Sequence, residues 1–139
     1  MALVTRARWR QNRPIMTKTP HTPDDARPGT PAASLPIAWS VTFLIAAALL
    51  AVTLSPGVPQ IGPPGSDKWQ HVAGFALLAL PLGYARPGWW LWIIAGAGAF
   101  GGVIELVQPH VGRSAEWADL VADVAGAAAA AITMRLVRG

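Results

Sequence analysis

Four long apolar stretches follow one another along this chain of 139 residues, and each is about as long as one membrane-spanning helix. A helix needs about 20 mostly apolar residues to cross roughly 30 Å of hydrocarbon. The stretches lack the alternation of polar and apolar residues that strands of a membrane β-barrel would show. The pattern therefore predicts an all-α polytopic membrane protein, with four transmembrane helices packed as a small bundle over residues 36–54, 69–85, 89–107 and 117–137.

The first stretch, residues 36–54, has two interpretations, a cleaved signal peptide or a membrane anchor. Thirty-five residues precede it, and it is longer than the apolar core of a usual signal peptide. We therefore interpret it as an anchor. The prolines and glycines that follow it predict a short, stiff loop, because proline fits neither a helix interior nor a central strand.

Residues 1–35 differ in composition from the rest of the chain. They hold six of the eleven basic residues and five of the thirteen prolines, with almost no apolar run. Such a segment cannot bury enough apolar surface to offset its loss of conformational entropy, so we expect a disordered basic tail. A nucleic-acid-binding arm or a membrane-surface arm would also be basic, but we interpret the tail as a topogenic signal and expect no nucleic-acid partner.

The overall composition agrees with a protein whose main partner is the lipid bilayer. Charged residues make up 13% of the chain and apolar residues 53%. A typical soluble domain has roughly 25% charged residues, so this chain lacks the charge to cover a water-exposed surface. Cysteine is absent, which excludes disulfides and thiolate metal sites.

Lysine and arginine predict the orientation, because they concentrate in cytoplasmic loops. If both termini lie on the cytoplasmic side of the cell membrane, nine basic residues are inside and two, Lys68 and Arg113, are outside. We therefore predict that both termini are cytoplasmic. A start at Met16 instead of Met1 leaves five against two, and the orientation is unchanged.

In this topology ten polar residues gather at the outer face, although up to 56 positions separate them. They include five of the seven acidic residues. The ten are Asp67, Lys68, His71, Glu105, Gln108, His110, Arg113, Glu116, Asp119 and Asp123.

Helical spacing predicts that these polar residues face one another inside the bundle. Asp67 and His71 are four positions apart and share one helix face. Asp119, Asp123 and Gly126 share another, and small residues such as glycine let membrane helices approach closely. An ionised Asp123 at mid-membrane would cost about 2.5–3.5 kcal/mol. We therefore expect Asp123 to be protonated, paired with a cation or beside water.

Three polar motifs occur in order along the chain. They are Asp67-Lys68-x-x-His71-x-x-x-Phe75, then Glu105-x-x-Gln108, then Gly112-Arg113 followed by Asp119-x-x-x-Asp123-x-x-Gly126. Over residues 36–137 this order resembles the VanZ-like family of small bacterial membrane proteins. Where the family often has asparagine, this chain has Asp123, which adds a potential charge. The resemblance implies a cell-envelope protein, and the family's namesake is associated with low-level resistance to the glycopeptide teicoplanin.

The main hypothesis is an outer-face pocket that binds or processes an envelope component, such as a lipid-linked or cell-wall precursor, and affects glycopeptide susceptibility. His71, Glu105 and Asp119 are the candidates for acid/base chemistry or for ligating a metal. No nucleophile motif or recognised metal signature accompanies them, so we assign no catalytic residue, metal ligand or cofactor. The candidate binding residues are Asp67, Lys68, Gln108, Arg113 and Asp123.

Two alternatives belong to other classes of protein. In the first, the chain is a non-enzymatic membrane subunit or scaffold, and the polar residues hold the helices together. In the second, Asp119 and Asp123 serve ion-coupled transport, although the inverted repeats and broken helices of many transporters are missing. The oligomeric state stays open in all three hypotheses.

Overall fold

The computed structural model describes residues 34–55 and 66–139, and within these ranges the chain forms helices and no strand. The predicted disordered tail, apart from Ser34 and Leu35, and the predicted proline-rich loop lie outside the described residues. The described α-helices are α1 (Ser34–Thr53), α2 (Ser66–Ala85), α3 (Trp90–Val107) and α4 (Trp117–Arg138). Two short 3₁₀ helices, η2 (Pro87–Trp89) and η3 (Gln108–Val111), precede and follow α3.

The helix bounds lie close to the predicted spans, with the largest difference at the start of α2. This helix begins at Ser66, three residues before the predicted span, and so includes Asp67 and Lys68. An acidic residue in the first turn is favourable because the N-terminal end of a helix carries partial positive charge. The start of α2 is therefore a polar helical turn that precedes its apolar part.

Three of the described helical segments are long and apolar enough to cross a membrane: Ser34–Thr53, Pro87–Val111 and Trp117–Arg138. They are the kind of segments that a multi-pass membrane protein requires. The α2 helix is not among them, because its first two turns carry polar residues and leave a shorter apolar part.

The α2 helix lies at the centre of the packing and contacts α1, α3 and α4. Its buried apolar side chains include Phe75 and Leu78, which join Ile104 of α3 in the core. The outer surface is also apolar: Trp92, for example, is 79% exposed and Leu106 is 73% exposed. So many exposed large apolar side chains are unusual for a soluble monomer and are typical of helices that face lipid.

Small residues allow α2 and α4 to pack closely. Ala122, Gly126 and Ala130 of α4 are spaced four positions apart on one helix face, and all three are buried. A Cβ atom on Gly126 would collide with the backbone carbonyl of Val72 on α2. Glycine is therefore required where the two helices are closest.

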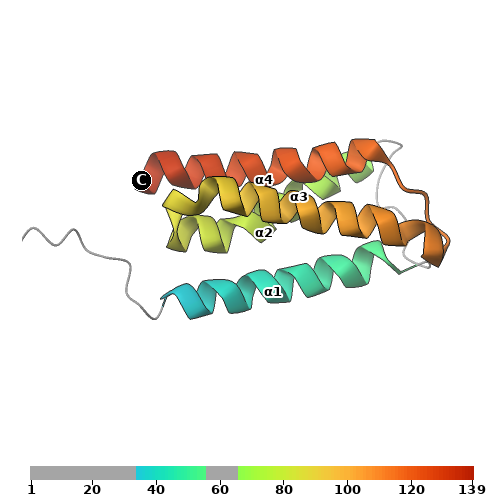
Figure 1. The fold of residues 1–139 in the computed structure, drawn as a ribbon, viewed down its shortest axis with the longest axis horizontal. Coiled ribbons are helices and arrows are strands. Elements are labelled where there is room, and N and C mark those ends of the chain that lie inside the picture. The colour runs from blue at the N-terminus through green and yellow to red at the C-terminus, as the bar shows by residue number, and fades with distance from the viewer. Residues whose placement is uncertain (1–33, 56–65) are drawn as a thin grey trace, which may run out of the picture.

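Successive helices run in opposite directions along the long axis of the molecule (Figure 1). The start of α1 and the C-terminus lie at one end. The start of α2, the end of α3 and the start of α4 lie at the other end, which brings the polar motifs of the sequence together.

Candidate functional site

Polar side chains from three helices converge at this second end of the molecule. Four of them are buried: Glu105 and Asp119 are each 7% exposed, Gln108 is 3% exposed and Asp123 is fully buried. We call the following set the polar cluster: Asp67, Lys68 and His71 of α2, Glu105 of α3, Gln108 of η3, Glu116 just before α4, and Asp119 and Asp123 of α4.

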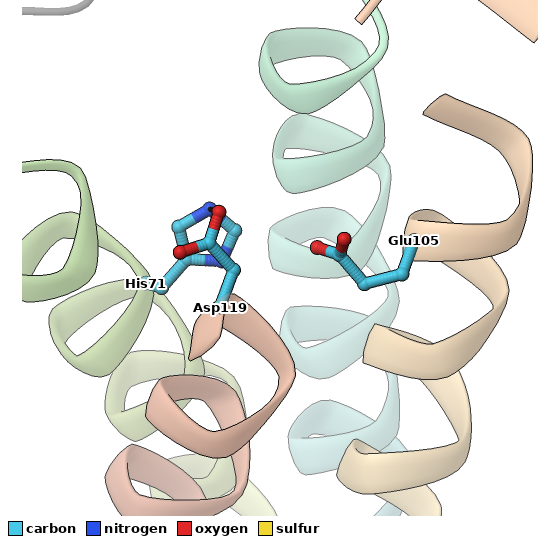
Figure 2. Close-up of side chains that lie close together, drawn as sticks. All are labelled: His71, Glu105 and Asp119. Carbon is cyan, nitrogen blue, oxygen red and sulfur yellow. Dashed lines mark ion pairs between the residues drawn. The ribbon is translucent and has the colours of Figure 1, made fainter. Parts of the chain in front are cut away.

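His71 joins α2 to two acidic residues of α4. Its Nδ1 lies 2.7 Å from Oδ1 of Asp123, and its Nε2 lies 3.6 Å from Oδ2 of Asp119. With Asp123 ionised, the proton of the short bond resides on Nδ1, so a neutral imidazole presents the lone pair of Nε2 toward Asp119. Figure 2 shows the His71 ring and the Asp119 carboxylate side by side.

Glu105 approaches the same point from α3, and its carboxylate points toward His71 and Asp119 (Figure 2). The backbone N–H of Glu116 donates to Oε2 of Glu105 at 2.7 Å. The amide nitrogen of Gln108, in the orientation that faces Glu105, donates to the two carboxylate oxygens at 3.3 and 3.2 Å. These donors hold the Glu105 carboxylate in a defined orientation.

Lys68 lies at the rim of the cluster, with its side chain 42% exposed. Its Nζ lies 3.3 Å from Asp67, 3.2 Å from Glu116 and 3.6 Å from Asp119. The hydrogen bond to Glu116 raises the pKa of Lys68 the most, and the hydrogen bond to Asp67 raises it further. Partial burial would raise the pKa of Asp67, but the hydrogen bonds and positive charge of Lys68 together lower it. Lys68 is therefore a firmly charged ammonium group that is shared by three carboxylates.

Carboxylates outnumber cations in the polar cluster, because five acidic side chains face one lysine and one histidine. A buried carboxylate is costly unless it is paired or hydrogen-bonded. Oδ1 of Asp119 and Oδ2 of Asp123 are nevertheless buried without a hydrogen-bond partner among the described residues. The inner part of the cluster therefore has spare negative charge.

Two overlapping groups of side chains have the spacing of a metal site. The first is His71, Glu105 and Asp119, and the second is Asp67, Glu116 and Asp119. Within each group the potential ligand atoms all lie within 4.8 Å of one another. In the second group Glu116 is exposed, and both Asp67 and Glu116 already pair with Lys68.

Two residues of the predicted outer face stand apart from the polar cluster. Arg113, predicted to bind a ligand, donates from Nη1 to the carbonyl oxygen of Ser55 at 3.4 Å and so links the end of α1 to the α3–α4 connection. His110 is exposed on η3 and has no hydrogen bond or ion pair with the described residues. The other predicted site residues belong to the cluster.

Glu116 is the cluster member that the sequence analysis did not single out as a site residue. Its backbone bonds Glu105 and its side chain bonds Lys68. The signal that could have found it is its position before α4, because the first N–H groups of a helix lack partners within that helix.

No family model, curated protein or solved structure matches this chain. The resemblance to the VanZ-like family therefore stays a prediction.

An apolar pocket of about 360 Å³ lies between α3 and α4 and has Glu105 in its lining. Val103 and Leu106 of α3 and Trp117 and Leu120 of α4 form much of the rest of its wall. A larger pocket of about 650 Å³ is lined by residues of α1, α2 and α3 and of the α2–α3 connection, without a charged side chain. The smaller pocket therefore places a carboxylate of the polar cluster beside an apolar space.

Proposed function

We propose that this chain is a VanZ-like integral membrane protein of the cell envelope that binds an amphiphilic envelope component, such as a lipid-linked cell-wall precursor. The polar cluster would take the charged headgroup, and the pocket between α3 and α4 would take part of the apolar chain. The observation that carries the proposal is that Glu105 belongs both to the cluster and to the lining of this pocket.

The partly exposed Lys68 and the character of the pocket support the same ligand class. Lys68 is partly exposed at the rim, where an ammonium group can contact a phosphate or carboxylate. Ligand sites in proteins are typically concave and mostly apolar, with a few placed polar groups, and the pocket beside Glu105 has this character.

In the proposed topology α2 is a fourth membrane-spanning helix, both termini are cytoplasmic, and the polar cluster faces the outside of the cell membrane. The excess of basic residues on the side of the termini supports this orientation. The central position of α2 supports its insertion, because α1, α3 and α4 cover it and its polar start lies at the end of the bundle.

The proposal is tested in a strain that lacks the gene, challenged with teicoplanin and other envelope-targeting antibiotics. We expect the wild-type chain to restore susceptibility to the parental level, and His71→Ala, Glu105→Ala and Asp119→Ala to fail. His110→Ala is the matched control, because this histidine is exposed and lies outside the cluster, and it should complement fully.

Abundance in the membrane separates this function from a structural role. Failure to complement at wild-type abundance supports a binding or processing site. Loss of complementation in proportion to loss of protein would instead support a scaffold in which the cluster holds the helices together. Full complementation by all three variants at normal abundance would refute the proposed site.

A further inference from the structure

The inner part of the polar cluster has an excess of carboxylates that favours the binding of a cation. The side chain of Asp119 is 10% exposed, and its Oδ1 has no hydrogen-bond partner among the described residues. The cation nearest to this oxygen is Lys68, at 3.6 Å. Lys68 also forms ion pairs with Asp67 and Glu116, at shorter distances. The His71 ring and the Glu105 carboxylate face the same space. Three electron-pair donors therefore converge on one point.

We propose that His71, Glu105 and Asp119 bind a divalent first-row transition-metal ion. Nε2 of His71 and one oxygen from each carboxylate would be the ligands. One potential ligand atom from each of the three residues lies within 4.8 Å of the other two, so one ion can contact all three after small side-chain movements. The inference stands on the geometry of the cluster and does not depend on the proposed envelope ligand.

The hydrogen bonds behind these ligands match those of known metal sites. A metal-binding histidine usually donates its other ring N–H to a carboxylate or carbonyl, which fixes the tautomer and the ring orientation. Here Nδ1 of His71 lies 2.7 Å from Asp123, so Nε2 is the nitrogen that is left for a metal. Ligating carboxylates are likewise held by hydrogen bonds, and Glu105 receives one from the N–H of Glu116.

The ligand set indicates the class of metal ion. The imidazole nitrogen suits Zn²⁺, and the two carboxylate oxygens suit Zn²⁺ as well as a harder ion such as Mn²⁺. Catalytic zinc sites commonly have three protein ligands and leave a position for water or substrate. A divalent ion would also offset the negative charge of the cluster, which would otherwise repel a phosphate-bearing headgroup.

The competing site is the second group, Asp67, Glu116 and Asp119. It contains no imidazole, and two of its carboxylates already pair with Lys68 at 3.3 and 3.2 Å. A metal ion there would have to displace the lysine. In the group with His71, neither His71 nor Glu105 pairs with Lys68. Asp119 can bind the metal through Oδ2, which lies 3.6 Å from Nε2 of His71.

The test uses the full chain, purified in detergent and stripped with a chelator. Zn²⁺ binding is then measured by competition with a chromophoric chelator, and Mn²⁺ binding by electron paramagnetic resonance. We expect one equivalent of metal per chain. Loss of an outer hydrogen-bond partner alone costs about 10- to 100-fold in affinity, so His71→Gln, Glu105→Gln and Asp119→Asn should each weaken binding by about 100-fold or more.

Two controls identify the site. Glu116→Gln removes the side-chain carboxylate of the competing group but keeps the backbone N–H that bonds Glu105, and its affinity should change by less than about 10-fold, below the loss expected for each ligand variant. His21→Ala combined with His110→Ala removes the other two histidines of the chain, and it should also bind normally.

X-ray absorption at the zinc edge of the wild-type protein gives a readout that does not depend on how well the variants fold. We expect a shell of nitrogen and oxygen ligands with a single imidazole. The inference is overturned if the wild-type protein binds no stoichiometric metal, if His71→Gln binds as tightly as wild type, or if the spectrum lacks an imidazole.

Discussion

Nδ1 of His71 lies 2.7 Å from Oδ1 of Asp123, a residue 52 positions later in the chain. This contact joins the second turn of α2 to the second turn of α4, and Asp123 is fully buried there. It is possible because Gly126, one turn further along α4, lets the two backbones approach. The most buried acid of the protein therefore has a histidine as its partner.

A double-mutant cycle measures the coupling free energy between His71 and Asp123. We expect the destabilisation by His71→Ala and by Asp123→Ala to be strongly non-additive, with a coupling free energy of about 1–3 kcal/mol, because contacting residues couple within this range. The free energy of unfolding is measured by denaturant titration in detergent. A control cycle pairs Asp123→Ala with His110→Ala, which should be additive within about 0.5 kcal/mol. Additivity in the His71 cycle would contradict the contact.

Gly101 of α3 makes room for the Asp123 carboxylate. A Cβ atom at this position would lie 2.5 Å from Oδ2 of Asp123, so Gly101→Ala should displace the acid and destabilise the protein by about 1–3 kcal/mol. Gly102→Ala is the matched control, because a Cβ there meets nothing within 4 Å. That change should be neutral or stabilising, since alanine favours a helix over glycine by about 1 kcal/mol. Equal stabilities of the two variants would refute this expectation.

Gly126→Ala should be more damaging than Gly101→Ala. The added methyl group meets the backbone carbonyl of Val72, which cannot rotate away as a side chain can. We expect α2 and α4 to separate and stability to fall by about 3 kcal/mol, the upper part of the range for overpacking. Gly96→Ala on α3, where a Cβ has open space, is the control. A thermal unfolding midpoint of Gly126→Ala at or above that of Gly96→Ala would argue against this close approach.

The pKa of Asp67 leads to a pH-dependent contribution to stability. The folded-state pKa lies below the ordinary value of 3.8, with Lys68 as the source of the lowering. The ionised form is thus favoured by folding, and the contribution is present above the unfolded-state pKa and lost as pH falls through the folded-state pKa. The difference in unfolding free energy between the wild type and Asp67→Asn should therefore shrink as pH is lowered below about 4. A difference that grows on acidification would have the wrong sign.

The absence of cysteine makes the topology directly testable. Arg86 and His110 are exposed at opposite ends of α3. With the polar cluster outside, a membrane-impermeant maleimide should label His110→Cys in intact cells and Arg86→Cys only after permeabilisation. Labelling of both from the same side would contradict a membrane-spanning α3, and the reverse pattern would invert the proposed orientation.

Much of the polar cluster could be predicted because its members are spaced regularly on helices. The four-residue spacing of Asp119 and Asp123 puts both on one face of α4, and both are buried. The pairing could not be predicted in the same way. Asp67 shares a helix face with His71, yet it pairs with Lys68 beside it, while His71 reaches across to Asp123.

Two contacts near the α3–α4 connection, one of Arg113 and one of Glu105, could not be predicted from the sequence. The charge of Arg113 and its position next to the acidic residues predict a role in binding, and that role stays a prediction. No feature of the sequence indicates that its guanidinium group also donates to the carbonyl of Ser55. The Glu105 carboxylate, in turn, is oriented by a backbone N–H of Glu116, and a pattern of side chains gives no sign of such a donor. Both contacts depend on how η3 and the segment after it connect α3 to α4.

The sequence by itself determined the helical character of the chain, the approximate bounds of its apolar helices and the end of the molecule at which the acidic residues gather. These features depend on local properties: the length of an apolar run, the period of the α-helix and the alternating direction of consecutive helices. Only the tertiary structure decided that α2 is the central helix, that His71 bonds Asp123 and that Glu105 faces Asp119. These contacts depend on how close the helices come and how they are rotated about their axes, which the packing at Gly101 and Gly126 sets.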